Sequence, residues 1–283
     1  MTLSQPNADV FVPDPHPQPE ALARCTHLGI GAHQDDLEFM ALHGILLCFQ
    51  RDDRWFGGIT CTDGASSSRT GPYAACSDEQ MKTVRTQEQK AAAVIGQYGF
   101  MAQLGHPSRN AKDASRRQPL VSDLATLITA AQPEVVYTHN PFDKHATHVG
   151  TLLAVIEAIR TLPEPQRPAR LIGCEVWRGL DWLPDLRKLI HDVSAHPNLA
   201  AALNGVFDSQ IAGGKRYDLA VEGRRAAKAT FLDSHAVDDA ERVQYAIDLT
   251  PLLAANASLP HFLQQHIDAF SAEVTAQVAN VSY

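Results

Sequence analysis

The sequence lacks several features that mark whole classes of protein. Its 283 residues contain no apolar run long enough to span a membrane, and 24 basic residues are outnumbered by 32 acidic ones. The resulting net charge of −8 argues against a general nucleic-acid or anionic-membrane surface. The first residues show no basic segment followed by an apolar core, so we expect no signal peptide.

Cysteine is scarce, and its spacing argues against a disulfide framework or a cysteine-rich metal site. The five cysteines are an odd number, are widely separated and form no Cys-x-x-Cys pair. Cys48, Cys61 and Cys174 lie in apolar or strand-like runs, where a buried free thiol is the ordinary state. This usage fits a reducing compartment, and we expect a cytoplasmic protein.

What the sequence does contain is a regular alternation of short apolar runs and amphipathic stretches. Strands are predicted near residues 27–32, 55–61, 100–104, 134–138 and 171–177, and helices near 37–49, 78–98, 120–131, 147–161, 197–207 and 216–231. This alternation indicates an α/β fold with a mostly parallel sheet and helices on both faces. Five prolines predict a flexible N-terminal arm over residues 1–22, and residues 23–283 then form a single domain.

One stretch, Leu28–Glu38, changes abruptly from apolar to polar. It begins as a buried strand and ends in His33, Asp35 and Asp36, which would lie on the turn into the next helix. A His-x-x-Asp pair offers one nitrogen and one oxygen ligand, which suits zinc, and Asp35 between them is free to act as a base. The alternative is structural, because either aspartate could be a helix N-cap that accepts a backbone N–H.

A second polar concentration follows the strand predicted at residues 134–138. His145 and His148 are three residues apart at the start of a helix and therefore project from the same side. One could bind a metal while the other reaches a substrate, although an isolated pair of this kind is more often a cap and a partly buried surface residue. Because the ends of parallel strands lie along one edge, the two polar segments are expected to meet, which favours the metal site.

The polar segments together resemble a known family. His33-Gln-Asp-Asp-Leu-Glu38 is similar to the His-Pro-Asp-Asp-x-Glu signature of the PIG-L/LmbE-like zinc deacetylases, and His145-Ala-Thr-His148 is similar to that family's His-Pro-Asp-His. Thr62-Asp-Gly64 and Arg85-x-x-Glu88 resemble further family positions, so the resemblance runs over residues 26–235. It implies a three-layer Rossmann-like fold, one zinc ion per chain (or another divalent transition metal), and removal of an acetyl group from an N-acetylglucosamine moiety.

The resemblance also implies a role for each matching residue. The zinc ligands would be His33, Asp36 and His148, and Asp35 would be the general base. His145 would stabilise the oxyanion or protonate the leaving amine. Two histidines and one aspartate leave a coordination position open for water, as in hydrolytic sites, and zinc lowers the pKa of that water to about 7.

Two positions depart from the family pattern. Gln34 replaces the usual proline, which we expect to loosen the turn without removing a ligand. Ala146-Thr147 replaces Pro-Asp, so the carboxylate that would hold His145 is lost. Asp143 is the candidate to take its place, and we count it among the residues near the substrate.

Several residues outside the paired motifs are candidate substrate contacts. Arg85 could contact the oxyanion or sugar hydroxyls, or be a solvated helix charge. Arg216, with Lys215, Arg224, Arg225 and Lys228, could bind a phosphate, although a solvated helix face is the more usual role of such residues. His235, just after the same helix, could close the pocket. Residues 173–182 resemble the branch of the family that can be fused to an amino-sugar-phosphate deaminase-like domain.

The sequence therefore predicts a zinc-dependent N-deacetylase that acts on a small N-acetylglucosamine compound, whether free, phosphorylated or chitin-derived. The alternatives are a hydrolase of another N-acyl or ester substrate and a non-catalytic sugar-binding homologue, although a mere binder has no need of Asp35. Gly29-x-Gly31 suggests a nucleotide-binding protein, but Gln34 stands where the third glycine is required. The family implies a homo-oligomer, and we expect neither a nucleic-acid nor a membrane partner.

Overall fold

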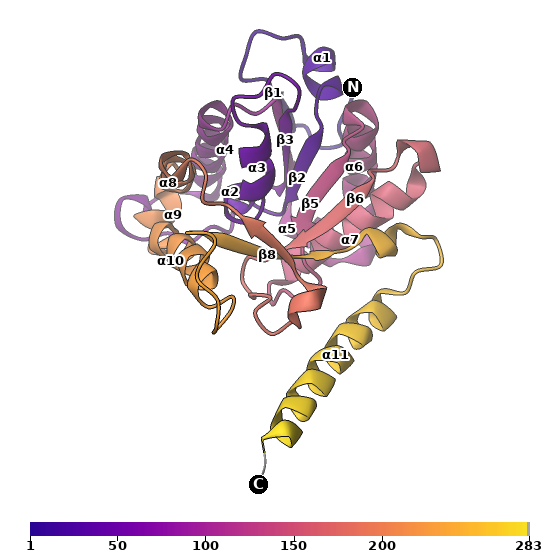
Figure 1. Ribbon diagram of the computed structural model, residues 1–283. Helices are drawn as coiled ribbons and strands as arrows, with labels where there is room; N and C mark the ends of the chain where they lie inside the picture. The colour runs from indigo at the N-terminus through magenta and orange to yellow at the C-terminus, as the bar shows by residue number, and fades with distance from the viewer. Residues whose placement is uncertain (282–283) are drawn as a thin grey trace.

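A computed structural model of the chain describes residues 1–281 (Figure 1). Its centre is a sheet of eight strands in the order β1-β4-β3-β2-β5-β6-β8-β7. The strands are β1 Asp9–Phe11, β2 His27–Gly31, β3 Phe56–Thr62, β4 Phe100–His106, β5 Val135–His139, β6 Arg170–Cys174, β7 Leu189–Asp192 and β8 Val243–Asp248.

Helices cover both faces of this sheet (Figure 1). One apolar core lies under α6 and α7, and a second lies on the opposite face under α2, α3, α4 and α8. The predicted three-layer α/β fold is confirmed. The helices are α1 Gln18–Ala23, α2 Asp36–Met40, α3 Leu42–Cys48, α4 Asp78–Ile95, α5 Ser108–Lys112, α6 Gln118–Ala131, α7 Ala146–Thr161, α8 Pro197–Gly205, α9 Asp208–Ile211, α10 Tyr217–Thr230 and α11 Leu259–Asn280.

The five central strands, β4-β3-β2-β5-β6, are parallel. Between β2 and β5 the order of strands reverses, because the chain first moves outward through β3 and β4 and then returns to β5. At such a reversal the loops that follow the two strands diverge and leave a crevice at their carboxyl ends. The loop after β2 carries His33, and the segment after β5 carries His145 and His148, so the topology brings both polar segments to this crevice.

The edges of the sheet depart from the parallel pattern. β8 lies antiparallel between β6 and β7, and the sequence pattern predicts neither β7 nor β8. β1 pairs antiparallel with β4 and lies within residues 1–22, where we expected a flexible arm. Ser4 adds two hydrogen bonds to Asp123, from its backbone N–H and from its hydroxyl. β1 and β7, with three and four residues, contain too few side chains to show a period, so the pattern misses them.

The helix predicted over residues 37–49 is interrupted. α2 ends at Met40 and α3 begins at Leu42, because Ala41 between them has non-helical backbone angles (φ −109°, ψ 19°). α3 then lies close against β5, since a Cβ atom at Gly44 would stand 2.6 Å from Tyr137 Cε2. The break leaves α2 as a separate helix of five residues that directly follows the turn with His33.

α4 begins as predicted. Ser77 accepts a hydrogen bond from the Gln80 N–H, and the Gln80 side chain accepts one from the Ser77 N–H, which forms a complete capping box. Cys48, Cys61 and Cys174 are buried, and none of the five cysteines forms a disulfide within the described residues. The predicted cytoplasmic location stays a prediction.

The last helix, α11, extends away from the body of the molecule (Figure 1). Phe262 and His266 near its start are buried, whereas Phe270, Val274 and Val278 further along are exposed. Nowhere in residues 1–281 is there a helix both long enough and apolar enough to cross a membrane. The predicted homo-oligomer also stays a prediction.

Candidate metal centre and cavity

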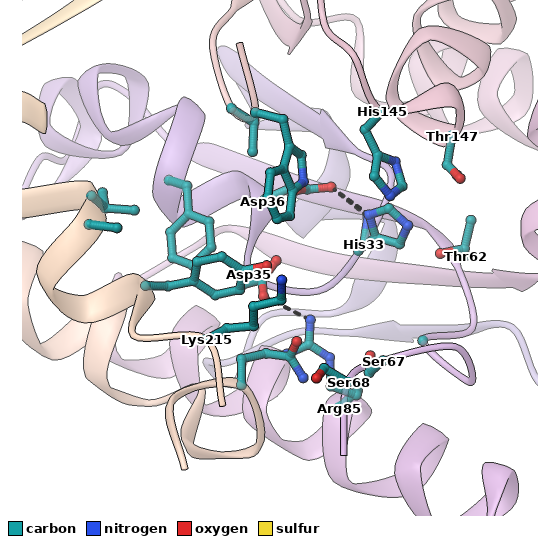
Figure 2. A pocket seen from close by; sticks show the side chains of 18 of the residues that line it. His33, Asp35, Asp36, Thr62, Ser67, Ser68, Arg85, His145, Thr147 and Lys215 are labelled. Atoms are coloured by element: carbon teal, nitrogen blue, oxygen red, sulfur yellow. Dashed lines mark hydrogen bonds and ion pairs between the residues drawn. The ribbon is translucent and has the colours of Figure 1, made fainter. Parts of the chain in front are cut away.

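The two polar segments meet at the carboxyl ends of β2 and β5. His33 Nδ1 lies 3.3 Å from Asp36 Oδ2 and 3.2 Å from His148 Nε2. His148 Nε2 lies 3.4 Å from Asp36 Oδ1. Ligand atoms around one tetrahedral ion with bonds of about 2.0–2.1 Å are about 3.4 Å apart, so these separations suit a single metal ion. Figure 2 shows His33 beside Asp36, with His145 next to it at the cavity.

Asp143 orients His148 from behind. Its Oδ2 atom lies 3.2 Å from His148 Nδ1, and its Oδ1 atom accepts the backbone N–H of His145 at 3.0 Å. Burial would raise the pKa of Asp143, but the hydrogen bond and charge of His148 lower it below the ordinary value. An ionised carboxylate only accepts, so His148 carries its proton on Nδ1 and leaves Nε2 free to bind a metal. Asp143 therefore holds the backbone of His145 rather than its ring, and it does not line the cavity.

His139, the last residue of β5, supports the same group from below. Its Nε2 atom accepts the Ala32 N–H at 2.9 Å and lies 3.4 Å from Asp36 Oδ2. The ring stacks on His148 at 3.9 Å between ring centroids. Two sets of three residues lie close enough to hold a metal, His33 with His145 and His148, and Asp36 with His139 and His148. In the second set the Ala32 N–H already occupies the His139 Nε2 lone pair. The sequence reasoning missed this residue, whose only signal is its place at a polar strand end.

Asp36 is held in its ionised form. Burial opposes ionisation, but His148 and His139 outweigh it and keep the pKa of Asp36 well below the ordinary value. Its Oδ2 atom also accepts the backbone N–H of His33 at 2.7 Å, which closes the turn between the two residues. Asp36 is therefore a buried anion surrounded by nitrogen atoms, as expected of a carboxylate that binds a metal.

Asp35 points away from Asp36. It occupies the N-cap position of α2 in left-handed backbone (φ 88°), and its side chain forms no capping hydrogen bond, so the structural alternative does not apply to it. Such backbone is strained in a residue with a side chain, at a cost of about 1–3 kcal/mol. Its Oδ2 atom instead accepts a hydrogen bond from Arg85 Nη2 at 3.0 Å, at the cavity wall. Burial raises the pKa of Asp35 to about 6, although Arg85 opposes the shift.

Gln89 of α4 ties Asp35 to a second buried carboxyl group. Its Oε1 atom accepts the Asp35 N–H at 3.1 Å, and its amide donates to Glu38 Oε1 at 2.9 Å. The Tyr98 hydroxyl also donates to Glu38 Oε1, at 2.7 Å. Burial raises the pKa of Glu38 to about 8. These contacts fix the start of α2 and with it the direction of the Asp35 side chain.

Gln34 anchors the turn instead of loosening it. Its side-chain amide is buried and donates to the Thr62 carbonyl and to Gln103 Oε1, each at 3.2 Å. Its backbone carbonyl accepts from Arg85. The expectation from the missing proline is therefore wrong, because the glutamine reaches β3 and β4 and replaces local stiffness with tertiary hydrogen bonds.

His145 lies over the same group without a carboxylate partner. Its ring centroid is 5.1 Å from that of His33 and 4.5 Å from that of His148. The ring stacks on Trp177 at 6.2 Å with an interplanar angle of 16°. Burial lowers the pKa of His145, and the nearby His33 adds to the shift. Among residues 1–281, no acidic residue forms an ion pair with this ring, and Thr147 forms no hydrogen bond with it.

We call His33, Asp36 and His148 the metal-binding group. This group opens onto a cavity of about 660 Å³, a size typical of small-molecule sites. The loop after β3, the strand-end segments and the helix α10 with the residues before it form its wall. The lining residues used below are His33, Asp35, Asp36, Asp63, Arg85, His145, Glu175, Val176, Trp177, Lys215, Tyr217, Arg224 and Arg225.

The other predicted substrate contacts divide into two groups. Arg85 is buried at the cavity wall and pairs with Asp35 at 3.0 Å and with Glu88 at 3.5 Å, so it is no solvated helix charge. Arg216 is exposed and pairs with Asp218 at 2.8 Å, and His235 is exposed beyond the end of α10. Neither Arg216 nor His235 lines the cavity. Their predicted contact with substrate has no support in this arrangement.

Comparisons with known proteins agree with the resemblance seen in the sequence. Residues 28–159 match the PIG-L family, described as GlcNAc-PI de-N-acetylase. This match confirms the resemblance over the segment that holds both polar motifs. No curated protein sequence matches the chain.

Solved structures share the fold. The conserved protein TT1542 from Thermus thermophilus has a TM-score of 0.61 at 20% identity, covering 83% of this chain and 99% of its own. N,N'-diacetylchitobiose deacetylase from Pyrococcus horikoshii has a TM-score of 0.61 at 15% identity, covering 79% and 83%. The 4-carboxy-2-hydroxymuconate hydratase GalB from Pseudomonas putida has a TM-score of 0.61 at 18% identity, covering 83% and 100%. A deacetylase and a hydratase share this fold, so the fold alone does not determine the reaction.

Proposed function

We propose that the protein is a metal-dependent deacetylase that hydrolyses the N-acetyl group of an amino sugar. The observation that carries the proposal is the set of three potential ligands, His33, Asp36 and His148, whose nitrogen atoms and two carboxylate oxygens lie 3.2–3.4 Å apart. The carboxylate of Asp35, held by Arg85, lies at the wall of the same cavity. The match to a de-N-acetylase family supports the same reaction. The diacetylchitobiose deacetylase among the structural relatives supports an amino-sugar substrate.

The residues present fit one zinc ion. Two imidazole nitrogens and a carboxylate are a common donor set for catalytic zinc, and they leave a position open for water or substrate. Asp143 behind His148 supplies the outer carboxylate that such histidines usually have. A bound ion would activate a water molecule and polarise the amide carbonyl. Another divalent transition metal could serve the same donor set.

The chain's own residues would complete the reaction. Asp35 projects into the cavity from the residue before the Asp36 ligand, and Arg85 holds its carboxylate in place. It is therefore placed to take the proton of an attacking water. His145 lies at the cavity wall beside His33, where it would donate a hydrogen bond to the carbonyl oxygen or a proton to the departing amine. Asp35 and His145 thus lie on two sides of the same reacting position.

Metal analysis together with an acetate-release assay tests the proposal. We expect about one zinc per folded chain and release of acetate from at least one of N-acetylglucosamine, its phosphates and diacetylchitobiose. A chelator should abolish the activity, and zinc should restore it. A folded, unchelated sample without a divalent ion would contradict the proposal, as would acetate release that a chelator leaves unchanged. Ester and other N-acyl compounds in the same panel test the alternative hydrolase.

A further inference from the structure

The segment around α10 carries five basic residues, and these differ in whether they pair with an acidic residue or line the cavity. Arg216 points outward and pairs with Asp218, and Lys228 is buried in an ion pair with Glu175. The other three, Lys215, Arg224 and Arg225, line the cavity. Figure 2 shows Lys215 projecting into the pocket from this side. One wall of the cavity is therefore basic.

No carboxylate of the described residues lies in direct contact with the basic wall formed by Lys215, Arg224 and Arg225. Within residues 1–281, none of Lys215, Arg224 and Arg225 has an acidic oxygen at ion-pair distance. Arg225 is only 2% exposed and donates from Nη2 to the carbonyls of Glu38 and Phe39. Its Nε and Nη1 atoms have no hydrogen-bond partner. A buried charge without a counter-ion is costly, and a bound anion would offset that cost.

The acidic residues of the cavity are already engaged elsewhere. Asp35 pairs with Arg85, and Asp63 lies 3.4 Å from Lys82. Glu175 pairs with Lys228. Asp36 lies among the histidines of the metal-binding group. The positive charge of the α10 wall is therefore free to attract a ligand.

Trp177 connects this wall to the metal-binding group. Its ring stacks with His145 at 6.2 Å between ring centroids, and Lys215 Nζ lies 5.2 Å from the centroid of the same ring. Tyr217 meets the same ring edge-on at 6.1 Å. Aromatic faces of this kind are suited to contact the apolar face of a sugar ring. A sugar bound beside Trp177 in this cavity would lie near both His145 and Lys215.

We propose that the natural substrate carries an anionic group, a phosphate monoester or a carboxylate, and that Lys215 and Arg224 bind it under the buried charge of Arg225. This inference rests on the proposed function, since it names the substrate class for the same cavity. Lysine and arginine give charge-assisted hydrogen bonds to either anion. The acetamido group would then lie at the metal-binding group, and the anionic group at the far end of Trp177.

Matched substrates and variants test the inference. The substrates are N-acetylglucosamine, its 6-phosphate, its 1-phosphate and the corresponding 6-carboxylate, 2-acetamido-2-deoxyglucuronate. We expect kcat/KM for at least one anionic compound to exceed that for the neutral sugar at least tenfold. Lys215→Gln and Arg224→Gln should each reduce this ratio, by about ten- to a hundredfold, mainly through KM. Arg216→Gln, next to Lys215 but exposed and paired outside the cavity, should leave the ratio unchanged.

A binding measurement separates this inference from the proposed reaction. Glucosamine and glucosamine 6-phosphate have no acetyl group to lose, so their binding to the full-length protein can be titrated by calorimetry. We expect the phosphate to bind more tightly, with an affinity that falls with salt and is weakened by Lys215→Gln. Charge-selective binding without acetate release from any probe would contradict the deacetylase and leave the basic wall supported. Acetate release with no preference among the anionic and neutral compounds would overturn the inference alone.

Discussion

The two ends of the cavity are built in different ways. At the metal end, strand termini and buried hydrogen bonds place each side chain, as in the chain of contacts from Asp143 to His148 and Asp36. At the basic end, Lys215, Arg224 and Arg225 come from one helix and the residues before it, and their charges have no acidic partner among the described residues. A side chain that takes part in the reaction needs a fixed position. A side chain that binds a charged substrate needs a charge that no other residue of the protein pairs with.

The family match divides the cavity along the same line. It covers residues 28–159, which include His33, Asp36, His145 and His148, and it ends before β6 and α10. The residues that we propose for the reaction therefore lie in the part of the chain that matches the family, whereas Trp177 and the basic wall lie outside the match. This difference suggests that the metal end determines the chemistry and that the basic end determines which molecule is bound.

Replacing Asp35 by asparagine should produce the largest effect and would test the metal end directly. Asparagine keeps the size of the side chain but cannot take a proton, so we expect kcat to fall about 10²- to 10⁴-fold. The metal content should stay at the wild-type level, because Asp35 is not among the close-set ligand atoms. Acetate release and metal analysis on the same sample check both points. Full activity in the variant would exclude Asp35 as the base.

The variant Asp143→Asn tests whether the metal end depends on its outer carboxylate. Asp143 accepts from His148, from the His145 N–H and from the Trp177 N–H. An amide has only one acceptor oxygen, so at least one of these donors would face an NH₂ group. We expect metal affinity to fall about 10- to 100-fold, measured by competition with a chelator. Asp113→Asn, on the surface, is the matched control, and an unchanged affinity in Asp143→Asn would contradict the role.

Replacing Gln34 by alanine asks whether the metal end depends on hydrogen bonds to neighbouring strands. The change removes donors to the Thr62 carbonyl and to Gln103 Oε1, and both partners lose a hydrogen bond in the interior. We expect the free energy of unfolding to fall by about 1–3 kcal/mol, measured by denaturant titration. Gln118→Ala, at an exposed helix start, is the control. If both variants were equally stable, the turn would be held by its backbone alone.

Much of the fold could be predicted because most of the central strands and the longer helices show their periods in the sequence, although the six-residue strand β8 was missed. The meeting of the two polar segments followed from the order of strands and helices, since parallel strand ends share one edge. The choice of His33, Asp36 and His148 as ligands came from the family resemblance. Short strands such as β7 and partners that depend on distant contacts could not be predicted. The anchoring of Gln34 on β3 and β4 is one such case, and His139 beneath the site is another.

The basic segment shows the same limit on a smaller scale. In the sequence, Arg216 and Arg225 are equivalent candidates for binding an anion. Whether each arginine faces the cavity depends on the rotation of α10 about its axis and on which acidic side chain lies close to it. Arg216 forms an ion pair with Asp218 outside the cavity. Arg225 is buried and donates hydrogen bonds to the Glu38 and Phe39 carbonyls of α2. The helical period of the sequence predicts which side chains share one face of a helix. It does not predict which other parts of the protein that face will contact.

A pair of histidines outside the cavity should have the smallest effect on activity, and it provides the baseline for any pH profile of stability. His43 and His191 stack at 3.9 Å between ring centroids, on α3 and β7. Burial lowers the pKa of His43 to about 4 and that of His191 to about 3, and His43 further disfavours protonation of His191. Since the unfolded chain binds these protons near pH 6.5, the pair stabilises the fold fully above that pH.

Stability should therefore fall as the pH drops from about 6.5 towards 4, by up to about 1.4 kcal/mol per pH unit for each proton that only the unfolded chain binds. His191→Gln should flatten this dependence, because one of the two buried titrating groups is gone. Denaturant titration at several pH values checks the slope, and His196→Gln is a control from the same region. An unchanged slope in His191→Gln would assign the acid sensitivity to other groups, and the metal-binding histidines of the cavity would then be the next to test.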